Sequence, residues 1–351
     1  MSDTPIVPPV PGLLPETEKH MFDLQSSQGQ LAALAGSPVA GPRWFSDITR
    51  TPPQSHCVIV AGARIHYLRW GDPTRPGILL VHGNAAHAFW WSFIAPFLAR
   101  DYHVAAMDLS GMGDSDWRAP IIREDGGEDS GYSMELFARE QMAVCEDAGM
   151  FKGAEPPVIV AHSFGGFVTM LAGKLYGDRL KGVVILDSPV NPPLREGRSG
   201  APVSSTPRPH NIYPSLAAAL ARFRLMPPQV CDNLFLLDWV ARHSLKEVTR
   251  PDGSPGFTWK FDPAIWQHFA IGDTETLLKA TRCRIAVFRG EHSVLMPPEV
   301  GTYIFNLLGR AAPVVEIPEA QHHIMLDQPL ALVAALRALL ADWQHSTAAR
   351  R

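Results

Sequence analysis

One serine of this chain lies between small residues in a segment that could present a nucleophilic hydroxyl. Ser163 follows the apolar, β-branched run 158–160 and precedes Gly165 and Gly166, after which an apolar helical pattern covers 167–176. Such a run predicts a buried strand, and a tight turn from a strand into a helix raises a serine side chain above the end of a sheet. Only small residues tolerate the close backbone approach there. The same residues also fit an ordinary turn with a surface serine, so the partners of Ser163 must decide between these interpretations.

A base is the first partner that such a serine needs. A serine hydroxyl is a poor nucleophile unless a base takes its proton, and histidine has a pKa near neutral pH. His322 and His323 lie in the loop between the last predicted strand, 313–317, and the last predicted helix, 330–343. A lone histidine in a loop is usually a polar surface residue, but this pair follows the end of a strand. We therefore take His322 as the candidate base and His323 as its alternative.

Strand and helix patterns alternate along most of the chain. The predicted buried strands are 77–81, 103–108, 158–162, 181–186, 284–290 and 313–317, and a hairpin over 57–70 precedes them. Strands that alternate with helices predict a mostly parallel sheet with helices on both faces, and ligands bind at the carboxyl ends of such strands. The residues with useful chemistry that follow these ends are His82, Ser163, Asp187, Glu291 and His322. Their shared edge predicts a single site.

Composition divides the chain into an extension, a core in two parts and an insertion. Residues 1–50 are rich in proline, glycine, serine and alanine, which predicts an N-terminal extension with a short helix within 16–34. The alternating pattern occupies 51–189 and resumes over 274–351. Residues 190–273 carry prolines and helical patterns, so we predict an inserted helical cap over the strand ends. Its predicted helices are 215–225, 227–243 and 263–269, after a basic loop with Arg195, Arg198 and Arg208.

The overall composition narrows the class of protein. The 351 residues carry a formal net charge of −4, so no basic surface for nucleic acid is expected. The four cysteines lie far apart without metal-ligand spacing, and we expect reduced thiols. Neither a bilayer-spanning run nor a secretory signal is found, which predicts a cytoplasmic protein with no membrane partner. The sequence has neither a dinucleotide glycine pattern nor a metal cluster, so we expect a small-molecule substrate and no cofactor.

Four motifs at the strand ends together resemble the α/β-hydrolase fold superfamily, and the resemblance covers roughly residues 55–345. These motifs are His82-Gly83-Asn84, the run Asp108 to Ser115, the elbow Ala161 to Gly166 with alanine in place of the first glycine of the usual G-x-S-x-G, and His322 with Asp327-Gln328-Pro329. The resemblance implies a serine-nucleophile, esterase-like hydrolase in which Ser163 attacks and His322 is the general base. It also implies an oxyanion hole made by the backbone N–H groups of Asn84 and Phe164.

The third member of the implied triad is where this chain departs from the family's pattern. Relatives usually carry an aspartate after the strand 284–290, in a pattern like G-E-x-D, whereas this chain reads Gly290-Glu291-His292-Ser293. A serine cannot stabilise an imidazolium as a carboxylate does. Two acids could replace the aspartate, namely Asp187 at the end of the strand after the serine helix, and Glu291 two residues from the usual position. We favour Asp187 and keep Glu291, or a dyad assisted by Ser293, as alternatives.

The predicted substrate is an ester or lactone of a mid-sized apolar or aromatic molecule, because aromatic residues crowd the predicted cap. The candidate contacts are Phe235, Trp239, Trp259, Trp266 and Phe269 in the cap, with His87, Trp90 and Trp91 below it. One alternative is a carbon–carbon bond hydrolase, but its members tend to carry a tryptophan shortly after the histidine, and 323–326 lacks one. A second alternative is a non-catalytic, ligand-sensing protein, which Ser293 would explain. Dehalogenases and epoxide hydrolases of this fold need an aspartate at the elbow, and Ser163 excludes them.

Overall fold

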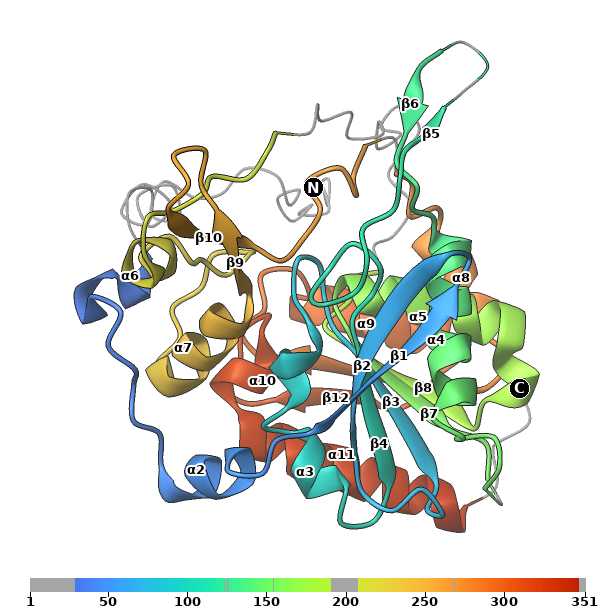
Figure 1. Ribbon diagram of the computed structural model, residues 1–351. Helices are drawn as coiled ribbons and strands as arrows, with labels where there is room; N and C mark the ends of the chain where they lie inside the picture. Colours follow the sequence, from blue (N-terminus) through green and yellow to red (C-terminus); the bar gives the residue numbers. More distant parts are fainter. Residues whose placement is uncertain are drawn as a thin grey trace, which may run out of the picture.

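A computed structural model describes residues 29–122, 124, 126–153, 155–190, 208–267 and 269–346 of the chain (Figure 1). Its centre is an eight-stranded sheet with the strand order β1-β2-β4-β3-β7-β8-β11-β12. These strands are β1 (Gln54–Val60), β2 (Ala63–Trp70), β3 (Gly77–Val81), β4 (His103–Met107), β7 (Val158–His162), β8 (Gly182–Leu186), β11 (Arg284–Gly290) and β12 (Val314–Ile317). Strand β2 lies antiparallel to both β1 and β4, and the remaining pairs are parallel. The predicted mostly parallel sheet is confirmed.

Helices cover both faces of the sheet because the central strands are apolar on both sides. Every residue of β3, β4, β7 and β8 is buried. Neighbouring residues of a strand point to opposite faces, so Ile78 and Leu80 join one hydrophobic cluster and Leu79 and Val81 join the other. The first cluster includes residues of η2 (Ala88–Trp91), α3 (Ala95–Leu98), α10 (Ile324–Asp327) and α11 (Pro329–His345). The second includes residues of α4 (Met134–Asp147), α5 (Phe164–Tyr176), α8 (Thr274–Lys279) and α9 (Pro298–Leu307) (Figure 1).

The segment between β8 and α8 contains a β-hairpin as well as helices. Its described elements are α6 (Leu216–Leu220), α7 (Leu234–His243), β9 (Leu245–Thr249) and β10 (Pro255–Trp259). The hairpin was not predicted, although an Asp-Gly pair between short extended runs is a hairpin signal. Gly253 in its turn has a φ of 82°, and the Asp252 side chain accepts a hydrogen bond from the Ser254 N–H at 3.0 Å. The two helices are shorter than predicted, and residues 263–267 form turns where a helix was expected.

The first described residues pack against this inserted segment. They include η1 (Gln30–Leu34) and α2 (Arg43–Thr49). The Gln30 side chain exchanges two hydrogen bonds with the backbone of Cys231, and the Phe45 ring lies 5.1 Å from that of Phe235. Part of the predicted N-terminal extension is therefore folded onto the insertion. Arg195, Arg198 and most of the predicted helix within 16–34 lie outside the described residues, and the predicted domain limits at 50, 190 and 273 stay predictions.

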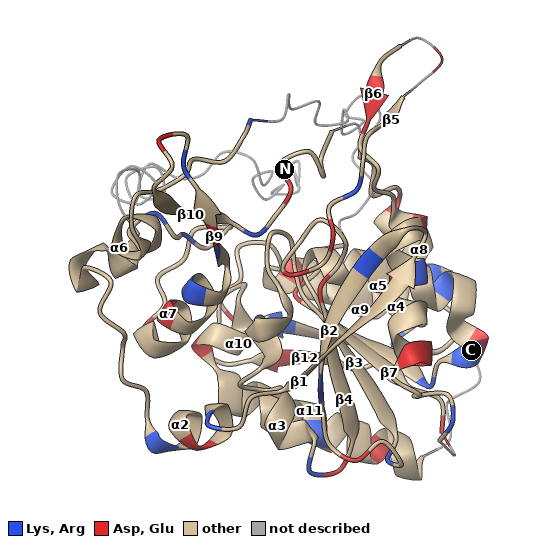
Figure 2. Cartoon of the chain, viewed as in Figure 1, with Lys and Arg blue, Asp and Glu red and all other residues tan. Residues whose placement is uncertain are grey.

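Acidic and basic residues are interspersed along the helices and loops of the chain (Figure 2). A two-stranded ribbon of β5 (Ile121–Ile122) and β6 (Glu128–Asp129) projects from the body (Figure 1). None of the described helices combines the length and the hydrophobicity needed to cross a membrane.

Candidate active site

Ser163 lies on a strained turn between β7 and α5. Its φ of 52° and ψ of −120° fall in a region that residues with a side chain rarely adopt. Two hydrogen bonds hold this backbone in place: the Ser163 N–H donates to the Leu186 carbonyl at 2.9 Å, and the Ser188 hydroxyl donates to the Ser163 carbonyl at 2.7 Å. Both partners belong to the end of β8 or the residues after it. The neighbouring strand therefore stabilises the conformation that exposes the serine hydroxyl.

The two glycines after Ser163 are required by close contacts. A Cβ atom at Gly165 would lie 2.4 Å from the carbonyl oxygen of His82, and one at Gly166 would lie 2.0 Å from the Ser188 hydroxyl oxygen. No real side chain tolerates such distances without movement of its neighbours. The start of α5 can therefore pack tightly against the ends of β3 and β8 only with glycine at these positions.

The structure brings Ser163, His322 and Asp187 together in one hydrogen-bonded series. The Ser163 Oγ lies 3.1 Å from Nε2 of His322, and the His322 Nδ1 lies 2.8 Å from Oδ1 of Asp187. His322 is 2% exposed and Asp187 is fully buried. The three residues follow β7, β12 and β8, so the parallel sheet gathers at one edge side chains that are far apart in the sequence. This geometry presents a hydroxyl to an imidazole whose opposite nitrogen contacts a carboxylate.

Asp187 has further donors, one of which is Ser293. The Gly290 N–H donates to Oδ2 of Asp187 at 2.8 Å, and the Ser293 hydroxyl donates to Oδ1 at 2.5 Å. The Ser293 oxygen in turn accepts hydrogen bonds from the N–H groups of Leu295 and Met296 at 3.2 and 3.1 Å. The serine at the family's usual acid position therefore contacts the carboxylate that comes from β8. Its hydroxyl helps to orient that carboxylate toward His322.

Glu291, the alternative acid, and His323, the alternative base, are not hydrogen-bonded to the Ser163 series. Oε2 of Glu291 accepts a hydrogen bond from the Glu319 N–H at 2.9 Å, and the Glu291 side chain is 40% exposed. The ring of His323 packs against those of Trp90 and His162, with centroids 5.2 and 5.5 Å apart. Among the described residues, neither Glu291 nor His323 makes a hydrogen bond with a side chain of the Ser163 series.

The two expected oxyanion donors lie on either side of the serine. Phe164 is the first residue of α5, and Asn84 follows β3 and Gly83. Within the described part of the chain, neither backbone N–H is paired with a carbonyl or a side chain. The side-chain oxygen of Asn84 accepts a hydrogen bond from the Trp266 indole at 3.2 Å. Gly83, which precedes Asn84, lies beside Ser163, because a Cβ atom at Gly83 would be 3.1 Å from that of Ser163. The oxyanion hole of Asn84 and Phe164 stays a prediction.

Three buried histidines organise the loops of the site. Nδ1 of His82 donates to the Gly83 carbonyl at 2.6 Å while its Nε2 accepts from the Leu109 N–H at 3.1 Å. Burial lowers the pKa of His82 and lowers that of His87 to about 3. Nε2 of His87 contacts the Val240 carbonyl and the Ser244 hydroxyl, so it connects η2 to α7 and does not face the serine. Burial, with the nearby His322, also holds the pKa of His162 well below its usual range.

Two of the five predicted cap aromatics lie beside the serine. The rings of Trp266 and Phe269 pack on that of Phe164, with centroids 5.0 and 5.8 Å apart. The other three aromatics pack on residues away from the serine: Phe235 and Trp239 contact Phe45, and Trp259 contacts Tyr213 and Phe223. Trp91 is fully buried in the core. Of the five predicted cap aromatics, Trp266 and Phe269 thus bring aromatic surface to the nucleophile.

A second serine–histidine–aspartate series exists that the sequence analysis missed. Ser55 Oγ lies 3.0 Å from Nε2 of His66, whose Nδ1 lies 2.7 Å from Oδ2 of Asp108. The Asp108 carboxylate also accepts hydrogen bonds from the N–H groups of Ala88 and Asp114. Burial alone would raise the pKa of Asp108, but the hydrogen bond from His66 and the neighbouring histidines lower it to about 2.

This second series differs from the first in the position of its serine. Ser55 lies in an extended strand, β1, rather than at a strained turn, and no helix begins after it. The adjacent amides that could stabilise an oxyanion are therefore not arranged around Ser55 as they are around Ser163. We assign the Asp108 contacts to holding the glycine-containing loop after β4.

Comparisons with known proteins agree with this fold. The sequence matches the family model described as "Alpha/beta hydrolase family" over residues 78–336. Epoxide hydrolase 4 from Homo sapiens is 25% identical over 138 residues, which are 38% of this chain and 35% of that protein. The chain thus spans about a third of the length of this curated relative.

Solved structures show the same fold. The thioesterase domain from the curacin biosynthetic pathway aligns with a TM-score of 0.64 at 22% identity, covering 83% of this chain and 100% of that domain. A novel esterase from Mycobacterium tuberculosis aligns with a TM-score of 0.58 at 21% identity, covering 89% and 95%. At these identities the likeness extends to the fold.

Proposed function

Because this chain belongs to the alpha/beta hydrolase family, we propose that it is a serine hydrolase that cleaves an ester or a lactone through an acyl-enzyme intermediate. The observation that carries the proposal is the hydrogen-bonded series of Ser163, His322 and Asp187, with distances of 3.1 and 2.8 Å. A nucleophile, a base and an orienting carboxylate in this order are what acyl transfer by serine requires.

The first half of the proposed reaction forms the acyl-enzyme. Ser163 Oγ bonds to the substrate carbonyl carbon while Nε2 of His322 takes the hydroxyl proton. Asp187 accepts the Nδ1–H of His322, which keeps the lone pair on Nε2 and stabilises the imidazolium. The N–H groups of Phe164 and Asn84 donate to the oxygen that becomes negative. The carbon–oxygen bond then breaks, and the leaving alkoxide takes the proton from His322.

The second half releases the acid by the same groups. Water gives a proton to Nε2 of His322 and bonds to the acyl carbon. The tetrahedral intermediate again places its oxygen between the two amides, and Ser163 leaves with the proton that His322 held. No net proton or electron is consumed beyond the water added. A lactone follows the same steps, with the alcohol and acid remaining in one product.

The name of the human relative raises epoxide opening as another reaction, and the elbow residue argues against it here. If Ser163 opened an epoxide ring, Oγ would form an ether with the ring carbon. An ether has no carbonyl for water to attack, so the enzyme would remain alkylated. A carboxylate at the elbow would form an ester instead, which water can cleave. Ser163 therefore favours acyl substrates.

The predicted non-catalytic alternative depended on Ser293 at the usual acid position. Asp187 offers His322 a carboxylate from β8, at 2.8 Å, which removes the reason for that alternative. Support for an apolar or aromatic substrate comes from Trp266 and Phe269, which pack beside Phe164. We therefore propose an acyl group of middle size, in contact with this aromatic surface.

Labelling with a fluorophosphonate probe tests the nucleophile. The unmodified protein should be labelled and Ser163→Ala should not. Ser55→Ala is the matched control, because Ser55 also lies beside a histidine paired with an aspartate. It should keep full labelling, whereas loss of labelling in Ser55→Ala alone would assign the nucleophile to the other series.

Rates with p-nitrophenyl esters of graded chain length, measured beside lactones, test the substrate class. They should peak at a middle acyl length, and a maximum at acetate would contradict the proposed substrate class.

A further inference from the structure

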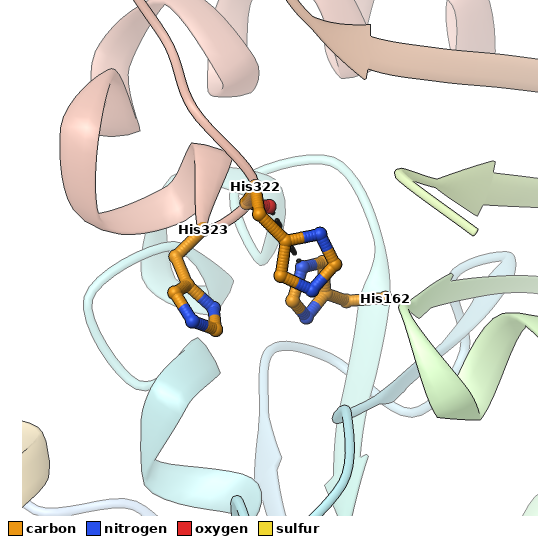
Figure 3. A group of neighbouring side chains, drawn as sticks. All are labelled: His162, His322 and His323. Carbon is orange, nitrogen blue, oxygen red and sulfur yellow. Dashed lines mark hydrogen bonds between the residues drawn. The ribbon is translucent and has the colours of Figure 1, made fainter. Parts of the chain in front are cut away.

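Three imidazoles gather beside the nucleophile. His162 ends β7, and His322 and His323 lie in the loop before α10 (Figure 3). Their ring centroids are 4.7 Å apart for His162 and His322, 4.8 Å for His322 and His323, and 5.5 Å for His162 and His323. One ring nitrogen from each residue lies within 4.8 Å of those of the other two.

His323 is the third member of this cluster. It is 6% exposed, and neither ring nitrogen forms a hydrogen bond of ordinary geometry within the described residues, although the Met226 backbone is close enough to act on the ring. Buried polar side-chain atoms usually have a hydrogen-bond partner, so a buried imidazole beside two others is a candidate metal ligand. It forms no hydrogen bond with a side chain of the Ser163 series.

Each of the other two histidines donates a proton from one nitrogen and carries its lone pair on the other. Nδ1–H of His322 donates to Asp187, which leaves the lone pair on Nε2, 3.1 Å from the Ser163 Oγ. Nε2–H of His162 donates to the His322 carbonyl at 2.9 Å, which leaves the lone pair on Nδ1. Histidines that bind metals usually have their far nitrogen bonded to a carboxylate or a backbone carbonyl in this way.

The chemistry of the three side chains also suits a metal. Imidazole nitrogens are ligands that zinc and copper prefer in proteins. Three histidines are a common ligand set for zinc, at metal–nitrogen distances of about 2.0–2.1 Å. The rings must approach one another to reach that geometry.

We propose that His162, His322 and His323 bind one divalent transition-metal ion, of the zinc or copper class, and that this ion inhibits the hydrolase. Inhibition rests on the proposed function, because the ion would occupy the lone pair on Nε2 of His322 that takes the proton of Ser163. While the metal is bound, Ser163 keeps its proton and does not attack. Removal of the metal by a chelator restores the base.

Zinc binding to Ser163→Ala, measured by competition with a chromophoric zinc indicator, tests the site without any need for turnover. We expect one ion per chain, with affinity reduced at least about tenfold in Ser163→Ala/His323→Gln. The matched control is Ser163→Ala/His292→Gln, because His292 lies on the surface with Glu291 and Glu319 in another group that could hold an ion. Equal zinc affinity with and without His323, or loss of binding on removal of His292, would overturn the proposal.

Inhibition is then measured with p-nitrophenyl ester after treatment with a chelator. With each protein compared with its own rate in the absence of zinc, His323→Gln should need at least about tenfold more zinc than the wild type for half inhibition. Copper(II) on the unmodified protein gives a test that needs no variant. Its electron paramagnetic resonance spectrum should show nitrogen couplings from imidazoles, and their absence would refute the site.

Zinc binding without esterase activity would refute only the proposed function, and esterase activity without zinc binding would refute only this inference.

Discussion

Asparagine has nearly the size and shape of aspartate but no charge, so Asp187→Asn tests the charge of the proposed triad acid. Asparagine tolerates the φ of 51° found at this residue. The Gly290 N–H donates to Oδ2 at 2.8 Å, and only the amide oxygen of an asparagine can accept it. The new NH₂ group must then face His322, where it donates to Nδ1. The ring proton of His322 moves to Nε2, which points at Ser163.

A histidine in that tautomer cannot take the proton of Ser163. The corresponding change in a serine–histidine–aspartate triad lowers kcat by about 10⁴-fold, which corresponds to about 5 kcal/mol of lost transition-state stabilisation. We expect a fall of this order in kcat for a p-nitrophenyl ester. KM should change little, because Asp187 is fully buried and would not touch the substrate.

Moving the carboxylate back to position 293 should restore part of the activity. The Ser293 oxygen lies 2.5 Å from Oδ1 of Asp187, so an aspartate at 293 extends toward His322. The Leu295 and Met296 N–H groups that donate to Ser293 could donate to the new carboxylate. Asp187→Gly leaves room for it and suits the positive φ. We expect Asp187→Gly/Ser293→Asp to exceed Asp187→Gly in kcat by about tenfold or more, about 1.4 kcal/mol.

The assay is ester hydrolysis at pH 7.5, with thermal melting followed by circular dichroism to verify folding. Glu291→Gln is the matched control, since it removes the alternative acid without touching the His322 series. It should remain near the wild-type rate. If Asp187→Asn keeps more than about a tenth of kcat, or if Glu291→Gln loses activity instead, the orienting role of Asp187 is wrong.

Three further predictions concern the residues around the series. The pKa of His87 is lowered from 6.5 to about 3 by burial, so below about pH 6.5 the unfolded state binds a proton that the folded state does not. The free energy of unfolding in urea should therefore fall from pH 7.5 to 5.5, and less steeply in His87→Gln. Gly165→Ala should lower both kcat and the melting temperature, because the new Cβ would lie 2.4 Å from the His82 carbonyl; an unchanged kcat would contradict this packing. Trp266→Phe removes a hydrogen bond to Asn84 worth about 1 kcal/mol. We expect kcat/KM, measured from initial rates, to fall by a few-fold for aromatic esters and by less for acetate esters.

The parallel sheet was predictable because its central strands are buried on both faces. Strands such as β3 and β7 are continuous apolar runs, and helical periods lie between them. The hairpin of β9 and β10 was missed although its Asp252-Gly253 turn was visible, because neighbouring helical patterns had more apolar residues. Residues 263–267 of the expected helix form turns, and there the Ala264 N–H bonds to the Asp262 side chain at 2.9 Å.

The sequence by itself determined which residue types follow the strand ends, since strand periodicity and turn chemistry are local properties of the chain. It therefore placed Ser163, His322 and both candidate acids on one edge of the sheet. Which carboxylate reaches the histidine depends on the folded sheet, because Asp187 and His322 are 135 positions apart and their contact requires β8 to lie between β7 and β11. The same packing put Ser293 on the carboxylate rather than on the ring, and placed the buried His323 imidazole beside those of His162 and His322.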